Sequence, residues 1–192
     1  MGEMMERGPG SKVRLDLFDS KSFKRGRGVL TEALWVIAFS PLMTSQLPGS
    51  RWRVSLLRAF GASIGKAVVI KPHVIVKFPW RLTVGDHSWI GEGGWIDNLA
   101  PVVIGSYACI SQGAYLCTGS HDWRQPTFDL ITKPINIGAS AWVCAKAIVA
   151  PGVTIGEGAV VGLGAVATSD VPDWRILRTG GGPLVIRRVT TA

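Results

Sequence analysis

The chain has 192 residues, of which 47% are hydrophobic and 18% are charged, a balance that supports one domain with a sizeable core. The formal net charge of +8 suits an acidic partner such as an anionic lipid or a phosphorylated small molecule. Nucleic acid is not expected as a partner, because no recognition motif accompanies the charge.

Residues 1–28 are polar, glycine-rich and charged, and we expect them to form a mobile basic segment. Residues 29–63 are predicted to form a helical cap, with short helices near 30–39 and 51–60. The apolar run at 33–39 is far shorter than the roughly 20 residues that span a bilayer. Two alternatives remain for this run: a helix packed on the rest of the chain, or a helix on a membrane surface, which the basic segment before it would favour.

The second predicted helix has an apolar face. Trp52, Leu56 and Phe60 recur at i, i+4 and i+8, so they lie on the same side of the helix. We expect this face to cover the first coil of a repetitive structure, because the open end of a solenoid must be capped.

From residue 64 onward, an aliphatic residue followed by glycine recurs in steps of six. These pairs are Ile64-Gly65, Val84-Gly85, Ile90-Gly91, Ile104-Gly105, Ile137-Gly138, Ile155-Gly156 and Val161-Gly162, and the register continues without glycine at Ile70, Ile96, Ile110, Leu116, Val143 and Val149. A six-residue period indicates a parallel β-helix of hexapeptide repeats, here over residues 64–172. The aliphatic side chains would stack inside the prism, and glycine would let the chain turn its corners closely.

Two interruptions break the repeat. Pro79-Trp80-Arg81 disturbs the register, which resumes at Val84. Residues 122–136 break it again after a complete coil, and we expect them to be extruded as a loop. A loop of this length inside a compact domain is usually functional. The tail at 173–192 is basic and is predicted to form a last strand or helix.

His121 is the candidate catalytic residue, because it lies where the complete coil ends and the extruded loop begins. A histidine there can project into a cleft between neighbouring prisms, and its unperturbed pKa of about 6.5 suits a general base. His73 and His87 occupy variable positions of the repeat and are expected to point outward. The three histidines are too widely spaced for the zinc site of a β-helical carbonic anhydrase, so we expect no metal.

Cys109, Cys117 and Cys144 lie within the repeat. An odd number of cysteines without short spacing argues against a disulfide framework or a zinc site. We therefore expect apolar, unpaired thiols and a cytoplasmic protein.

The stretch Leu116–Asp122, with the sequence LCTGSHD, resembles the catalytic segment of hexapeptide-repeat O-acetyltransferases of the colanic-acid-biosynthesis type. The block Val149–Gly156, with the sequence VAPGVTIG, is typical of the wider maltose, galactoside and nodulation acetyltransferase superfamily. The segment Leu57–Gly65 resembles the narrower group, and the resemblance covers roughly residues 28–188.

This resemblance implies an all-β, left-handed parallel β-helix that forms a homotrimer, with each active site between two prisms. It also implies that His121 is the general base, which takes the proton from an acceptor hydroxyl as that oxygen attacks the thioester of acetyl-CoA. The residues expected along the acetyl-CoA slot are Trp142, Ala145, Leu163, Gly164, Thr168 and Arg187. The residues expected near the acceptor are Asp97, Asn98, Asp122 and Trp123. Asp97 and Asn98 have an equal alternative as turn residues that bond their own backbone.

The implied function is transfer of acetyl to a sugar hydroxyl, as in an exopolysaccharide precursor or a related carbohydrate, whether or not it is lipid-linked. Leu163 and Gly182 depart from the family pattern beside the acetyl-CoA slot. The alternatives are an antibiotic, serine or lipid acceptor, or a non-catalytic β-helical scaffold that docks on membranes or partner enzymes. Contact with the inner membrane surface is a further hypothesis.

Overall fold

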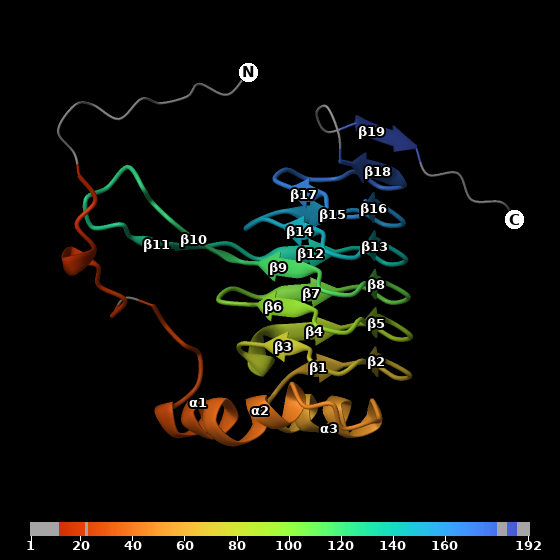
Figure 1. Cartoon of the computed structure of the whole chain (residues 1–192), viewed down its shortest axis with the longest axis horizontal. Helices are drawn as coiled ribbons and strands as arrows, with labels where there is room; N and C mark the ends of the chain where they lie inside the picture. The colour runs from red at the N-terminus through yellow and green to blue at the C-terminus, as the bar shows by residue number, and fades with distance from the viewer. Residues whose placement is uncertain (1–11, 22, 180–183, 188–192) are drawn as a thin grey trace, which may run out of the picture.

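The computed structural model of the chain describes residues 12–21, 23–179 and 184–187, the last group by its backbone. Three parallel sheets form the walls of a prism, helices close one end of it, and a hairpin projects from one side (Figure 1). The predicted fold class, a parallel β-helix of hexapeptide repeats with short N-terminal helices, is confirmed.

Each sheet takes one short strand from each successive coil. The first sheet consists of β1 (Ser63–Ile64), β4 (Leu82–Val84), β7 (Val102–Ile104), β12 (Ile135–Ile137) and β15 (Thr154–Ile155). The second consists of β2 (Val69–Ile70), β5 (Trp89–Ile90), β8 (Cys109–Ile110), β13 (Trp142–Val143), β16 (Val160–Val161), β18 (Arg175–Arg178) and β19 (Leu184–Arg187). The third consists of β3 (Ile75–Val76), β6 (Trp95–Asp97), β9 (Tyr115–Cys117), β14 (Ile148–Val149) and β17 (Val166–Ala167).

The aliphatic residues of the six-residue period form the core. Ile64, Val84, Ile104, Ile137 and Ile155 pair in register along the first sheet. Each of these side chains is at most 8% exposed. The other two sheets carry equivalent inward ladders, so the predicted stacking of aliphatic residues is confirmed.

The glycines that follow these residues lie where one coil almost touches the next. A Cβ atom added to Gly105 would lie 2.6 Å from the backbone nitrogen of Ala139 and 2.8 Å from the carbonyl carbon of Gly138. Because both atoms belong to the backbone of the next coil, neither can turn aside as a side chain would. Glycine is therefore required here by close approach of the backbone.

The first interruption is a short 3-10 turn, η3 (Pro79–Arg81), after which the register resumes in β4. The second differs from the expected loop. The chain leaves the coil at Gly119, before His121, and forms an antiparallel hairpin of β10 (Gly119–His121) and β11 (Leu130–Thr132). Its backbone pairing satisfies hydrogen-bonding groups that an irregular excursion would leave to water. The coil resumes at Ile135.

The helical cap begins with one continuous run rather than the helix that was expected to stop before Pro41. This run contains α1 (Val29–Leu34), a π-helical turn η2 (Trp35–Phe39) and α2 (Ser40–Met43), and it is preceded by a 3-10 turn η1 (Leu15–Leu17). Pro41 directly follows the π-helical turn, where the regular hydrogen-bond ladder of the helix is already interrupted. Within the described residues, no helix is both long and apolar enough to span a membrane.

The second helix of the cap, α3 (Arg51–Ala59), rests on the first coils with a different face from the one expected. Its fully or nearly buried side chains are Arg53, Val54 and Leu57, whereas Leu56 and Phe60 pack only partly against the core. Arg53 is 0% exposed and donates hydrogen bonds to four backbone carbonyls between residues 43 and 49. This guanidinium therefore fixes the connection between α2 and α3.

We expect Gly105→Ala to lower the stability of the fold by ~1–3 kcal/mol, because its methyl group would displace the backbone of the next coil. This corresponds to a fall of several degrees in the midpoint of thermal unfolding. The control is Gly28→Ala, since an added Cβ atom there meets nothing within 4 Å. Equal midpoints for the two variants would contradict the account of the corner.

Candidate functional site

His121 lies on the hairpin strand β10 and is held at one ring nitrogen. Its Nδ1 lies 2.8 Å from the carbonyl oxygen of Phe128, near the tip of the hairpin. A carbonyl can only accept a hydrogen bond, so the neutral ring must carry its proton on Nδ1. Nε2 then has a free lone pair and can accept a proton, as a general base requires.

Two aromatic rings fix the plane of this imidazole. The Phe128 ring stacks on His121 with a centroid separation of 4.3 Å and an interplanar angle of 4°. The Phe18 ring meets it edge-on at 5.4 Å. Phe18 belongs to the N-terminal segment, which runs beside the hairpin (Figure 1). The side chain is therefore positioned by residues on both sides of it.

Asp122 and Trp123 follow His121 at the start of the hairpin tip. Arg124 donates hydrogen bonds of 2.8 and 3.2 Å to the two carboxylate oxygens of Asp122. These bonds hold the pKa of Asp122 below its ordinary value, so it is anionic at neutral pH. Trp123 is 46% exposed. Trp123 therefore lies at the surface, whereas the Asp122 side chain is 18% exposed.

Asp97 lies on the outer face of the third sheet and is only 9% exposed. Lys77 places its Nζ 3.0 Å from Asp97 Oδ1, and the Tyr115 hydroxyl donates a hydrogen bond of 3.2 Å to Oδ2. Burial raises the pKa of Tyr115, so this hydroxyl keeps its proton. The Tyr115 ring also stacks on Trp95 at 4.5 Å. Asp97 borders a cavity of about 240 Å³ where this sheet meets the helical cap.

Asn98 has a structural role in this arrangement. Its side chain is 0% exposed, its Oδ1 accepts from the backbone N–H of Phe78 at 2.9 Å, and its Nδ2 donates to the carbonyl of Phe78 at 2.7 Å. The amide thus bridges two successive coils and has no surface to offer an acceptor. Asn98 therefore bonds the backbone of a neighbouring coil rather than its own, which neither of the two expected roles had described.

Four of the residues expected along the acetyl-CoA slot lie on the two coils that follow the hairpin. Trp142 is 44% exposed on β13 and donates its indole N–H to Ser111 Oγ at 2.8 Å. Ala145 and Gly164 are neighbours, because the N–H of Gly164 donates to the carbonyl of Ala145 at 3.0 Å. The space beside Gly164 is open, and Leu163 next to it is 68% exposed. These four residues therefore offer an accessible surface.

Two further residues of that group stand apart. Thr168 is exposed and follows β17 in the third sheet. Arg187 pairs through its backbone with Arg175 in the antiparallel pair of β18 and β19, so the described part of the tail contains strands, one of the two predicted alternatives. The expected departure at Gly182 lies outside the described residues.

Other reactive groups are dispersed. His73 and His87 have left-handed backbone conformations, with φ of 60° and 59°, and His87 stacks on Tyr107. All three cysteines are free thiols, and burial raises the pKa of Cys144. Over the ranges that the structure describes, no three side chains of His, Cys, Asp or Glu gather closely enough to hold a metal ion.

The partners of the site residues were not predicted from the sequence. One coil in this part of the chain is twenty residues long. The same spacing separates Lys77 from Asp97, and Asp97 from Cys117. That spacing would have identified Lys77 as a neighbour of Asp97. Phe18 has no such signal, because it lies about a hundred residues from His121 and outside the repeat.

Comparison with known proteins identifies relatives of the chain, although no family model matches it. WcaF of Escherichia coli (strain K12), named as a colanic acid biosynthesis acetyltransferase, is 40% identical over 168 residues, which make up 88% of this chain and 91% of WcaF. Among solved structures, a hexapeptide-repeat acetyltransferase from Vibrio cholerae aligns with a TM-score of 0.74 and 27% identity, over 85% of this chain and 95% of that one. A second structure under that name, complexed with acetyl coenzyme A, aligns with a TM-score of 0.67 and 28% identity, over 78% and 83% of the two chains.

We expect Asn98→Ala to destabilise the protein without weakening acceptor binding. The change leaves a buried backbone N–H and C=O unpaired, at a cost of ~1–3 kcal/mol for each group. Thermal unfolding measures the stability, and acceptor KM measures binding. The control is Asn136→Ala, because Asn136 is exposed on β12. A raised KM with unchanged stability would instead place Asn98 in acceptor binding.

Proposed function

This chain belongs to the family of hexapeptide-repeat acetyltransferases that includes WcaF, and from that membership we propose that it transfers acetyl from acetyl-CoA to a sugar hydroxyl. The support for an acetyl-CoA donor is that the Vibrio cholerae relative was solved in complex with acetyl coenzyme A. The support for a carbohydrate acceptor is the role in colanic acid biosynthesis that the name of WcaF states. An exopolysaccharide precursor is the acceptor class that we favour.

The observation that carries this proposal is the state of His121. Its Nδ1 is bound by the carbonyl of Phe128, its ring packs against two aromatic neighbours, and among the described residues no hydrogen-bond partner is found for its Nε2. A general base needs one ring nitrogen free to accept the proton, and this arrangement leaves Nε2 for that role.

The proposed reaction is a direct transfer. His121 Nε2 takes the proton from the acceptor hydroxyl as that oxygen forms a bond to the thioester carbonyl carbon. The negative charge on the carbonyl oxygen is stabilised by preorganised donors, most simply backbone N–H groups. The tetrahedral intermediate then collapses, the bond to sulfur breaks, and the thiolate takes the proton from His121. No covalent enzyme intermediate is needed.

We assign acetyl-CoA to the coils that follow the hairpin, and the acceptor to the hairpin and the coil before it. The pantetheine arm would lie along Trp142, Ala145, Gly164 and Thr168, where the surface is open, and Arg187 would meet the nucleotide phosphates. Leu163 would border the same slot. Asp97, Asp122 and Trp123 would contact the acceptor, since carboxylates accept hydrogen bonds from sugar hydroxyls.

A homotrimer is part of the proposal. Trp89 and Trp142 are 55% and 44% exposed and point outward from the same sheet, with Cys109 between them in register. On the third sheet Trp95 is 42% exposed. Apolar aromatic faces of this kind are typical of surfaces that another subunit covers. Packing three prisms side by side would complete the active sites.

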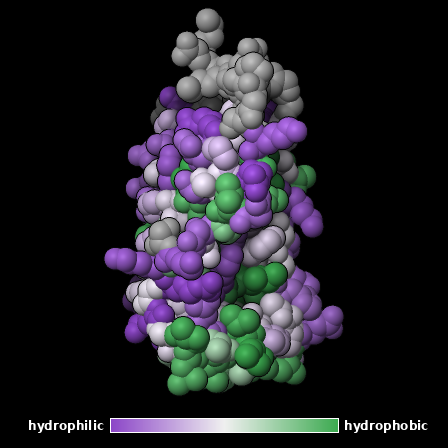
Figure 2. Space-filling view, turned by 90° about the vertical axis from the view of Figure 1, so that its left-hand side faces the viewer, coloured by the Kyte–Doolittle hydropathy of each residue, from purple (hydrophilic) through white to green (hydrophobic). Residues whose placement is uncertain are grey.

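Contact with a membrane surface is the third part of the proposal. Val29, Leu30 and Ile37 are 83%, 83% and 77% exposed and form an apolar surface at the end of the molecule (Figure 2). Trp35 does not contribute, because it is 1% exposed and donates its indole N–H to the carbonyl of Val76 at 3.0 Å. An apolar helix beside a basic segment suits shallow insertion into an anionic leaflet.

We expect His121→Asn to keep the fold and acetyl-CoA binding but to lower kcat by roughly 10²–10⁴, the usual effect of losing a general base. The matched control is His87→Asn, because His87 lies on the outer surface and stacks only on Tyr107. Acetyl transfer to a panel of sugars measures the effect. Near-normal turnover in folded His121→Asn would remove His121 from the mechanism.

Sedimentation velocity should show a stable trimer at the protein concentration used in activity assays. The reason is that isolated prisms would leave the tryptophan-bearing faces in water. A monomer that retains full activity would rule out an active site shared between subunits.

Co-sedimentation with anionic phosphatidylglycerol vesicles should show binding at low salt that fades as ionic strength rises, because exposed charges are screened. Ile37→Glu should weaken this binding, since it places a charge in the apolar surface. Neutral phosphatidylcholine vesicles are the control. If equal amounts of protein remain in the supernatant with and without anionic vesicles, the helices do not bind the membrane and serve only as a cap of the prism.

A further inference from the structure

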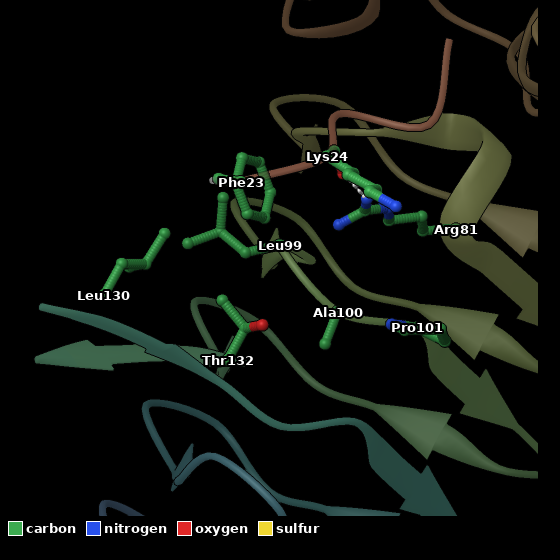
Figure 3. Close-up of a pocket in the computed structure, with 8 residues that line it drawn as sticks. All are labelled: Phe23, Lys24, Arg81, Leu99, Ala100, Pro101, Leu130 and Thr132. Atoms are coloured by element: carbon green, nitrogen blue, oxygen red, sulfur yellow. Dashed lines mark hydrogen bonds between the residues drawn. The ribbon is translucent and has the colours of Figure 1, made fainter. Parts of the chain in front are cut away.

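A cavity of about 450 Å³ lies beside the hairpin, on the side where the N-terminal segment passes. Leu130 and Thr132 of β11 form one wall, and Leu99 belongs to the corner that forms the floor (Figure 3). Phe23, Lys24 and Arg81 close the opposite side. None of the roles assigned above uses this cavity.

The cavity is adjacent to His121 through the pairing of the hairpin. Leu130 is directly opposite His121 in the antiparallel register, and Thr132 is opposite Gly119. Side chains of directly paired residues project from the same face of a sheet. His121 therefore lies on the face of the hairpin that Leu130 and Thr132 turn toward the cavity.

Two cations lie at the far wall without a matching anion. Lys24 and Arg81 both line the cavity, and the Arg81 guanidinium lies against the backbone of Lys24 (Figure 3). Neither side chain forms an ion pair with a carboxylate in the part of the chain that the structure describes. Like charges repel, so this arrangement is favourable only when an anion lies between them or water screens them.

The guanidinium of Arg81 is held in place rather than free in solvent. It donates to the backbone carbonyl of Lys24, and it lies over the rings of Phe23 and Phe78 at 5.1 and 5.4 Å from their centroids. Trp80 anchors the same segment, since its indole N–H donates to the carbonyl of Arg25 at 2.8 Å. The Arg81 side of this wall is thus preorganised, which reduces the entropy lost when a ligand binds.

We propose that this cavity binds the phosphate of a phosphorylated glycosyl acceptor, with Arg81 and Lys24 on the phosphate and the sugar extending toward His121. The inference rests on the proposed acetyl transfer to a sugar, and it specifies the chemical class of the acceptor. Arg81 offers a planar fork of donors that matches phosphate oxygens, and Lys24 adds a point charge. Two cations suit the dianionic charge of phosphate better than the single charge of a sugar carboxylate.

Binding of pyrophosphate, measured by calorimetry, tests the site without any acetyl transfer. Lys24→Gln and Arg81→Gln should each weaken pyrophosphate binding by roughly 10–100-fold, the fold-change expected for a lost hydrogen bond to a charged group. Arg81→Lys should restore part of it. The control is Lys71→Gln, because Lys71 is exposed and does not line the cavity. Absence of pyrophosphate binding, equal weakening by the control, or equally tight binding of glucuronate would overturn the proposal.

Two phosphorylated probes distinguish the source of the phosphate. UDP-glucose represents a nucleotide-linked acceptor, and a farnesyl diphosphate-linked glucose represents a lipid-linked one. Either should bind more tightly than methyl glucoside, with the difference lost in Lys24→Gln, and the tighter of the two identifies the source. If neither binds more tightly than methyl glucoside, the proposal is wrong. Intact pyrophosphate binding without acetyl transfer to any sugar would contradict the proposed function and leave this anion site standing.

Discussion

The structure depends on the close approach of successive coils at the corners of the prism. Backbone atoms of the next coil lie within 3 Å of where a side chain of Gly105 would begin, and the same holds at Gly85 and Gly138. This approach brings the inward aliphatic side chains into direct register, so that each coil buries the residues of its neighbour. The resulting scaffold is rigid because every displacement of one coil is opposed by the next.

The candidate site lies where the chain leaves this rigid prism to form the hairpin. The hairpin leaves the prism between β9 and β12, and the coils on both sides remain paired across the gap, since β7 pairs directly with β12. The root of the hairpin is therefore fixed, and its own pairing carries that order out to His121. A general base must be held in one orientation and one tautomer, and the Phe128 carbonyl and two aromatic rings supply both.

The repeat could be predicted from the sequence because its physical signal is local and periodic. An inward residue is typically followed six residues later by another with the same environment, so Ile64 and Ile70 predict one another. The extruded segment was also visible, but its hairpin was not, because Leu130-Ile131-Thr132 is too short a run to distinguish from a loop. The role of Asn98 was open because burial decides it, and burial depends on the neighbouring coil.

Contacts between distant segments could not be predicted. Phe18 reaches His121, and Lys24 reaches Arg81, through the path of an N-terminal segment that lies outside the repeat and has no periodic pattern. The helical cap shows the same limit, since the apolar run at 33–39 predicted a helix but not which of its side chains would be buried, and Ile37 is exposed. Trp35 is the residue of this run that is buried against the third sheet.

The most direct test of this account is the tautomer of His121, measured by nitrogen-15 NMR in a variant in which His73 and His87 are replaced by asparagine, so that His121 is the remaining histidine of the chain. We predict that the neutral imidazole carries its proton on Nδ1 and has an unprotonated Nε2. A ring protonated mainly on Nε2 would contradict the account, because that nitrogen could not then accept the proton of an acceptor hydroxyl.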